Sequence, residues 1–111
     1  MENEDENDDI HGNSKESKKK QHLYEIVDSE SNITHKFGIS GEKLNNNGTS
    51  KRANKQVNLL NRIFGFVKYF ASVLIKDIEG RQIALSFEDK KIKEFKNKFG
   101  ANPKGNIKPK K

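Results

Sequence analysis

The chain has 111 residues, of which 31% are hydrophobic and 34% are charged, so its length suits one small domain with a thin core. It contains no cysteine, which excludes disulfides, thiolate zinc sites and thiol nucleophiles and leaves any metal, preferably a hard cation, to oxygen or histidine ligands. No apolar run approaches the roughly 18 residues that span a bilayer, and the acidic start lacks the layout of a secretory signal.

Charge is distributed unevenly along the chain. Residues 1–21 hold seven acidic residues and four lysines, whereas the remainder holds nine acidic residues and eighteen Lys or Arg, so the first part carries −3 and the rest +9. A positive field attracts phosphate backbones, which makes nucleic acid the first expected partner, followed by an anionic membrane or an acidic protein. The alternative is a lysine-rich surface that only keeps the protein in solution.

The first 21 residues have a single aliphatic side chain, Ile10, among polar and charged residues. Such a segment cannot bury enough surface to offset its ordering entropy, so we expect a disordered linker over residues 1–21 and a folded domain over residues 22–111. The domain opens with two β-favouring runs, residues 22–28 and 33–40, which flank a polar turn and predict a β-hairpin.

A long loop and a helix are expected to follow the hairpin. Residues 41–51 are rich in Gly and Asn, and loops of this length tend to carry function. Thr49 or Ser50 can cap a helix over residues 51–64. The apolar stripe of that helix comprises Val57, Leu60, Ile63 and Phe64.

The remaining elements complete the fold class. Residues 66–78 are dense in aromatic and β-branched side chains, which predicts a strand buried on both faces. An amphipathic helix is expected over residues 81–99, ended by Gly100, and a basic tail follows. The β-β-α-β-α order predicts a small α+β domain, in which helices pack on a three-stranded, largely antiparallel sheet whose central strand is the first.

Glu88 lies on the apolar stripe of the last helix, three residues after Leu85 and four before Ile92. An unpaired carboxylate is costly to bury, so Glu88 must pair with a cation, become protonated or bind a metal ion. A structural salt bridge to Arg52 or Arg81 and a metal site remain equal alternatives at this point.

Arg52, Tyr24 and the two histidines of the hairpin each have a possible functional role and an ordinary structural one. Arg52 begins a helix beside the glycine-rich loop, where it could face a phosphate or simply be solvated. Tyr24 lies between apolar neighbours and is more often a core residue than a catalyst. His22 and His35 could face each other across the hairpin, but their spacing supplies no further zinc ligands, so a structural role is expected.

Together these residues resemble the GIY-YIG endonuclease family, especially the divergent versions carried as C-terminal modules of bacterial polymorphic toxins. The first-strand motif, which ends in tyrosine, corresponds to His22-Leu23-Tyr24, and the second, which ends in glycine, corresponds to Lys36-Phe37-Gly38. Only Tyr24 and Gly38 keep the expected identities, because Lys36 stands where a tyrosine is usual. The resemblance covers roughly residues 22–110.

The later motifs continue the resemblance. Arg52 matches the arginine of the family's first helix, and Gln56 lies one turn on, where His or Tyr is common. The metal-binding glutamate after an Ala-Leu run corresponds to Glu88, and a late asparagine corresponds to Asn106, with Asn102 as a substitute. The loop between Gly38 and Arg52 and the segment between Glu88 and Asn106 are both longer than is usual.

The resemblance implies hydrolysis of phosphodiester bonds with one metal ion, Mg²⁺ or Mn²⁺, held by Glu88. Arg52 would neutralise charge on the phosphate, Tyr24 or Lys36 would orient or deprotonate the attacking water, and Gln56 and Asn106 would position groups by hydrogen bonding. DNA is favoured over RNA as the substrate.

The resemblance also implies a biological setting. The protein would be a monomeric effector that is secreted or delivered into the cytoplasm of a target cell, with an acidic immunity protein as partner and no membrane partner. If it is an endonuclease, we expect Arg52 and Glu88 on elements packed side by side, with Tyr24 lining the same concave surface. The alternatives are a basic module that binds nucleic acid without catalysis and an interaction protein whose basic face meets an acidic partner.

Overall fold

The computed structural model describes residues 18–107. The elements in chain order are β2 (Lys20–Asp28), β3 (Ile33–Ser40), α1 (Lys51–Phe64), β4 (Tyr69–Glu79), α2 (Arg81–Phe99) and a 3₁₀ turn, η1 (Lys104–Asn106). The predicted α+β class and the β-β-α-β-α order are confirmed. Residues 1–17 of the expected linker and residues 108–111 of the tail lie outside the described part of the chain.

The three strands form one antiparallel sheet in the order β3-β2-β4, so the first strand of the hairpin is central, as predicted. β2 begins at Lys20, two residues before the expected start, because Gln21 pairs with Ile78 on β4 and is buried. The hairpin turn contains Asn32 with a φ of 58°, a conformation that asparagine tolerates better than most residues.

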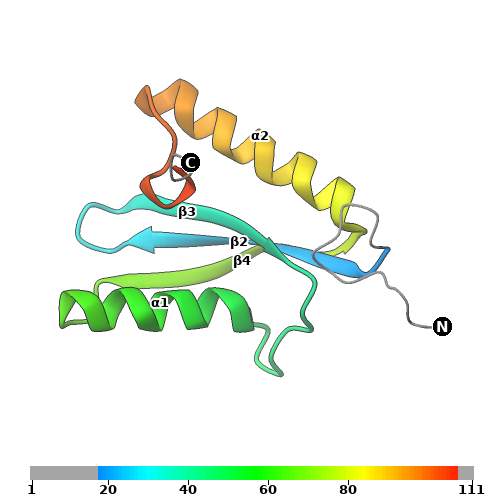
Figure 1. Cartoon of the computed structure of the whole chain (residues 1–111), viewed down its shortest axis with the longest axis horizontal. Helices are drawn as coiled ribbons and strands as arrows, with labels where there is room; N and C mark the ends of the chain where they lie inside the picture. The colour runs from blue at the N-terminus through cyan, green and yellow to red at the C-terminus, as the bar shows by residue number, and fades with distance from the viewer. Residues whose placement is uncertain (1–17, 108–111) are drawn as a thin grey trace, which may run out of the picture.

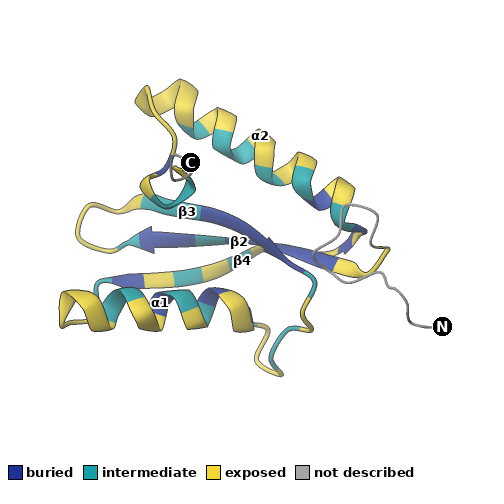
Figure 2. Cartoon of the chain, viewed as in Figure 1, coloured by how far each residue is buried: buried dark blue, intermediate teal, exposed yellow. Residues whose placement is uncertain are grey.

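Consecutive residues of β2 face opposite sides of the sheet, and each side carries one helix. Tyr24 packs with Ala53 and Val57 of α1, whereas Leu23 packs with Ala84 of α2. Figure 1 shows the sheet between the two helices, and Figure 2 shows that the buried residues concentrate on β2 and β3. Since α1 and α2 cover different faces, the expectation that they pack side by side is wrong.

α1 has the bounds that the sequence predicts. Ser50 caps its N-terminus by accepting a hydrogen bond from the backbone N–H of Ala53, and Gly65 ends it in the left-handed conformation. The buried residues are Ala53 and Val57. Ile63 and Phe64, which were expected on the apolar stripe, are exposed.

β4 differs from the prediction. It starts at Tyr69 rather than at residue 66, and its exposed and covered residues alternate along most of its length, so it is an edge strand and not a strand buried on both faces. Phe66 and Val67 are exposed residues of the loop that leads into it. Asn61 of α1 holds the strand start, since its amide accepts from the backbone N–H of Tyr69 and donates to the Tyr69 carbonyl.

α2 also has its predicted bounds and ends at Gly100. In contrast to α1, it has no side-chain cap at its N-terminus, and Ala84 is its one buried residue. Leu85, Glu88, Ile92 and Phe95 are half-buried along the side that faces the rest of the domain. Within residues 18–107, neither helix has the length and hydrophobicity that a membrane crossing requires.

Candidate active site

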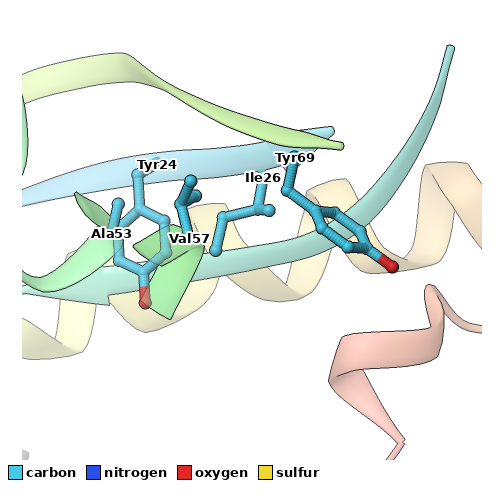
Figure 3. Close-up of a cluster of buried hydrophobic side chains, with 5 residues drawn as sticks. All are labelled: Tyr24, Ile26, Ala53, Val57 and Tyr69. Carbon is cyan, nitrogen blue, oxygen red and sulfur yellow. The ribbon is translucent and has the colours of Figure 1, made fainter. Parts of the chain in front are cut away.

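The Tyr24 side chain forms the centre of the polar cluster on the α1 face of the sheet. Gly38 lies opposite Tyr24 in the β2–β3 register, and a Cβ atom at Gly38 would come within 2.3 Å of both the Cζ and the hydroxyl of the tyrosine. The ring therefore lies directly over β3, a position that glycine alone permits. Figure 3 shows it beside Ala53 and Val57.

Two residues of α1 contact the Tyr24 hydroxyl. The hydroxyl donates a hydrogen bond of 3.2 Å to Oε1 of Gln56, and Arg52, one turn earlier on the same face of the helix, hydrogen-bonds to it as well. Burial raises the pKa of Tyr24, while Arg52 and Gln56 oppose the rise and the charge of Glu88 adds to it. Because the raised pKa keeps the hydroxyl protonated at neutral pH, Tyr24 acts as a hydrogen-bond donor there.

Lys36 lies two residues before Gly38 on β3, so it shares the sheet face of Tyr24. It is half-buried. Burial and then the positive charge of Arg52 lower the pKa of Lys36, and the negative charge of Glu88 partly offsets this. An amine whose pKa is lowered is a better proton acceptor near neutral pH than an ordinary lysine.

Glu88 projects from α2 into an open cleft of about 610 Å³. The side chain is half-buried, and Asp89, which the sequence analysis did not single out, lines the same cleft with Asn102 and Asn106. Tyr24, Lys36 and Arg52 do not line the cleft. The negative charge of Glu88 nevertheless raises the pKa values of both Tyr24 and Lys36, as the last and smallest of the causes that act on each.

Asn106 of η1 makes a two-point contact with the edge of β3. Its Oδ1 accepts from the Phe37 backbone N–H at 2.8 Å, and its Nδ2 donates to the Phe37 carbonyl at 2.8 Å. This contact fixes η1 against β3 between Lys36 and Gly38 and so sets one wall of the Glu88 cleft. Asn102, the alternative match, lines the cleft as well.

The oxygen atoms of the side chains that line this cleft are of the type that binds a hard cation such as Mg²⁺. Among residues 18–107 there is no group of three or more His, Asp or Glu side chains that could hold a metal ion by themselves. Glu88 nevertheless supplies a carboxylate in an open cleft that Asp89 also lines, although Asp89 forms a salt bridge to Lys93 at 3.0 Å. Mg²⁺ is commonly held by one or two carboxylates with substrate phosphate and water as the other ligands.

The histidines do not face each other. His22 pairs with Ser40, whereas His35 lies at the irregularity in the register between Lys36 and Thr34. His22 is buried and its Nε2 lies 2.7 Å from the Ser50 hydroxyl, so it holds the residue that caps α1. The capping pattern of the sequence singled out Ser50, but no signal linked it to His22.

The six predicted site residues thus form two groups that meet at β3. Tyr24, Lys36, Arg52 and Gln56 lie on the α1 face, and Glu88 and Asn106 lie at the cleft between α2 and η1. Fold and site together define a small α+β domain whose polar cluster adjoins an acidic cleft.

The chain belongs to the family described as URI fold toxin 2, whose model matches residues 14–100. The protein is therefore a toxin module. Searches of curated proteins and of solved structures gave no match.

Proposed function

We propose that this toxin module is a divalent-metal-dependent endonuclease that hydrolyses phosphodiester bonds of nucleic acid, with DNA favoured over RNA. One observation carries the proposal. The half-buried carboxylate of Glu88 lies in an open cleft and acts electrostatically on a cluster in which Arg52 and Gln56 contact the Tyr24 hydroxyl. The resemblance to the GIY-YIG endonucleases assigns hydrolytic roles to these same residues.

Glu88, with Asp89 beside it, would hold Mg²⁺ or Mn²⁺ in the cleft. When bound, such an ion supplies charge that stabilises the phosphate and the leaving oxygen. The chain itself provides the second cation, Arg52, an exposed residue on the first turn of α1. Its guanidinium would bind a non-bridging phosphate oxygen and stabilise the charge that develops there.

Of the two candidates for the proton acceptor, we favour Lys36. Its pKa is lowered, chiefly by burial, whereas the pKa of Tyr24 is raised and its side chain is 1% exposed. We assign proton abstraction from the attacking water to Lys36. We assign a positioning role to Tyr24, whose hydroxyl donates to Gln56 and interacts with Arg52.

The toxin setting extends the proposal. A nuclease of this kind would be a secreted or delivered bacterial effector that acts in the cytoplasm of a target cell. Residues 22–111 carry a charge of +9, so an acidic immunity protein would be its electrostatically matched inhibitor. We assign a monomer as the active form.

The direct test is to incubate the protein with plasmid DNA and with total RNA, each in the presence of Mg²⁺ and again with excess EDTA. We expect cleavage of DNA in Mg²⁺ and none in EDTA. Intact DNA and RNA under both conditions, with a folded protein, would contradict the proposal. Cleavage that persists in EDTA would contradict the metal requirement.

The second candidate is a basic module that binds nucleic acid without cutting it. It is favoured by Asn106, both of whose amide atoms are engaged with the backbone of Phe37 and are therefore occupied by a structural contact. This candidate predicts salt-dependent binding in the same experiment with no cleavage.

A further inference from the structure

A second cleft, of about 490 Å³, opens between the β2–β3 hairpin and the C-terminal end of α2. In Figure 1 the orange end of α2 and the red η1 turn lie beside that hairpin. Apolar side chains form much of its lining, namely Ile33, Phe95, Phe99 and Ile107. Its volume lies in the range of small-molecule sites in proteins, about 300 to 1,000 Å³.

The α2 side of this cleft offers an aromatic surface. The rings of Phe95 and Phe99 are packed with centroids 4.4 Å apart, and Phe99 remains 48% exposed. The ammonium group of Lys98 lies 5.4 Å from the centre of the Phe99 ring. A flat apolar ring can stack on such a surface, and a neighbouring cation favours one that carries phosphate groups.

The hairpin side of the cleft offers polar groups, from Asp28, Ser31, Thr34 and His35, and Lys104 of η1 lines the cleft as well. The His35 ring packs edge-on against Tyr69 at 5.0 Å. Gly105 lies so close that a Cβ atom there would be 3.0 Å from the imidazole. Because the His35 ring is packed between Tyr69 and Gly105, this wall of the cleft is formed before any ligand arrives.

The two clefts are continuous. Asn102 and Ile107 line both this cleft and the one that contains Glu88. We propose that the second cleft binds an unpaired nucleobase of the nucleic acid substrate, stacked on Phe99, while the adjoining phosphodiester lies at Glu88. The proposal rests on the proposed function and adds a substrate preference, because a paired and stacked base of a duplex cannot enter. The module therefore prefers single-stranded or locally unpaired segments of its substrate.

The test compares two short single-stranded oligonucleotides of equal length, one with bases and one that is abasic throughout, so that the phosphates are the same. Binding to the full chain is measured at equilibrium in EDTA, where no cleavage occurs. We expect the oligonucleotide with bases to bind roughly tenfold more tightly, the range that stacking on one aromatic side chain provides. Equal affinities would assign binding to the phosphates alone and overturn the proposal.

Substitution of Phe99 locates the effect. In a folded Phe99→Ala protein the preference for bases should disappear, and Phe99→Tyr should retain it. Phe66→Ala is the matched control, since Phe66 is a comparably exposed aromatic side chain outside the cleft, and it should bind like the parent. A Phe99→Ala protein that keeps the full preference would overturn the assignment to this cleft.

Binding measured in EDTA and cleavage measured in Mg²⁺ together separate the base-binding proposal from the endonuclease proposal. A protein that distinguishes the two oligonucleotides and cuts neither DNA nor RNA in Mg²⁺ would retain the base site and refute the enzyme. A protein that cuts but binds both oligonucleotides equally would retain the enzyme and refute the base site.

Discussion

The two helices of this domain are attached to the sheet in different ways. α1 closes one face, where Tyr24, Ile26 and Ala53 are at most 1% exposed. α2 is longer, with 19 residues against 14, yet Ala84 is its one buried residue. The comparison indicates that α1 buries more of its own residues than α2 does, although the α2 face of the sheet also holds a buried cluster of Leu23, Ile39, Ile78 and Ala84. The looser α2 side leaves room for the two clefts that we assign to the substrate.

Matched deletions in the two regions test this difference and should give the largest effect on stability. Ile26→Ala removes a fully buried side chain from the α1 face and should lower the free energy of unfolding by about 3 kcal/mol. Ile92→Ala makes the same change at a half-buried position on α2 and should cost about 1 kcal/mol. Denaturant titration of both proteins measures the two costs, and equal costs would break the comparison.

Gly38→Ala should have the next largest effect, a loss of about 2 to 3 kcal/mol, because the new methyl group would overlap the Tyr24 ring. Gly48→Ala provides the control, since it has no neighbour within 4 Å and only its φ of +84° resists the change. A thermal or denaturant melt compares the two. If Gly38→Ala cost no more than Gly48→Ala, the tyrosine could not be held against β3 as described.

The cap of α1 should contribute less. Ser50→Ala removes the hydrogen bond to the Ala53 backbone and the contact with His22, for a loss of about 1 kcal/mol. Ser86→Ala is the matched change on α2, where the hydroxyl is exposed and bonds within its own helix, and it should leave the unfolding midpoint nearly unchanged. A cost at Ser86 that matched the cost at Ser50 would contradict the view that α1 is the more firmly fixed helix.

The smallest expected effect is a pH dependence at His22. Burial lowers its pKa below the usual 6.5, although the charge of Glu42 opposes the shift. The unfolded chain then binds more protons than the folded one, so this contribution to stability is complete above pH 6.5 and is lost as the pH falls through the lowered pKa. His22→Gln should reduce the slope of stability against pH over that interval, in which His35, whose pKa burial also lowers, continues to titrate. Unfolding measured as a function of pH would show the change. An unchanged slope would place the titrating group elsewhere.

Much of the fold followed from local patterns in the sequence. Both helices have their predicted bounds, because Ser50, Gly65 and Gly100 are strong local end signals. The start of β4 was misplaced because Phe66 and Val67 have the composition of a strand but lie exposed in a loop. That composition measures β-propensity and not the pairing with β2 that decides where a strand begins.

Several of the candidate residues that the sequence singled out lie together in the structure, while their roles stay predictions. The sequence singled out Tyr24, Arg52 and Gln56, and the structure joins them through the tyrosine hydroxyl. The sequence could not show that α1 and α2 cover opposite faces of the sheet. Local periodicity predicts which side of a helix is buried, but it does not predict which face of the sheet the helix packs on. For the same reason the sequence did not reveal that Asp89 shares the cleft of Glu88.

The most direct test of the account is the rate of DNA cleavage in Mg²⁺ by Glu88→Gln, measured beside Glu94→Gln, which changes an exposed glutamate on the same helix. The amide keeps the size of the side chain and removes the charge that a hard cation requires. We expect Glu88→Gln to remain folded and to bind DNA, with cleavage reduced by orders of magnitude, and Glu94→Gln to cut at the parent rate. A folded Glu88→Gln protein that cuts DNA as fast as the parent would contradict the assignment of Glu88 as the metal-binding residue.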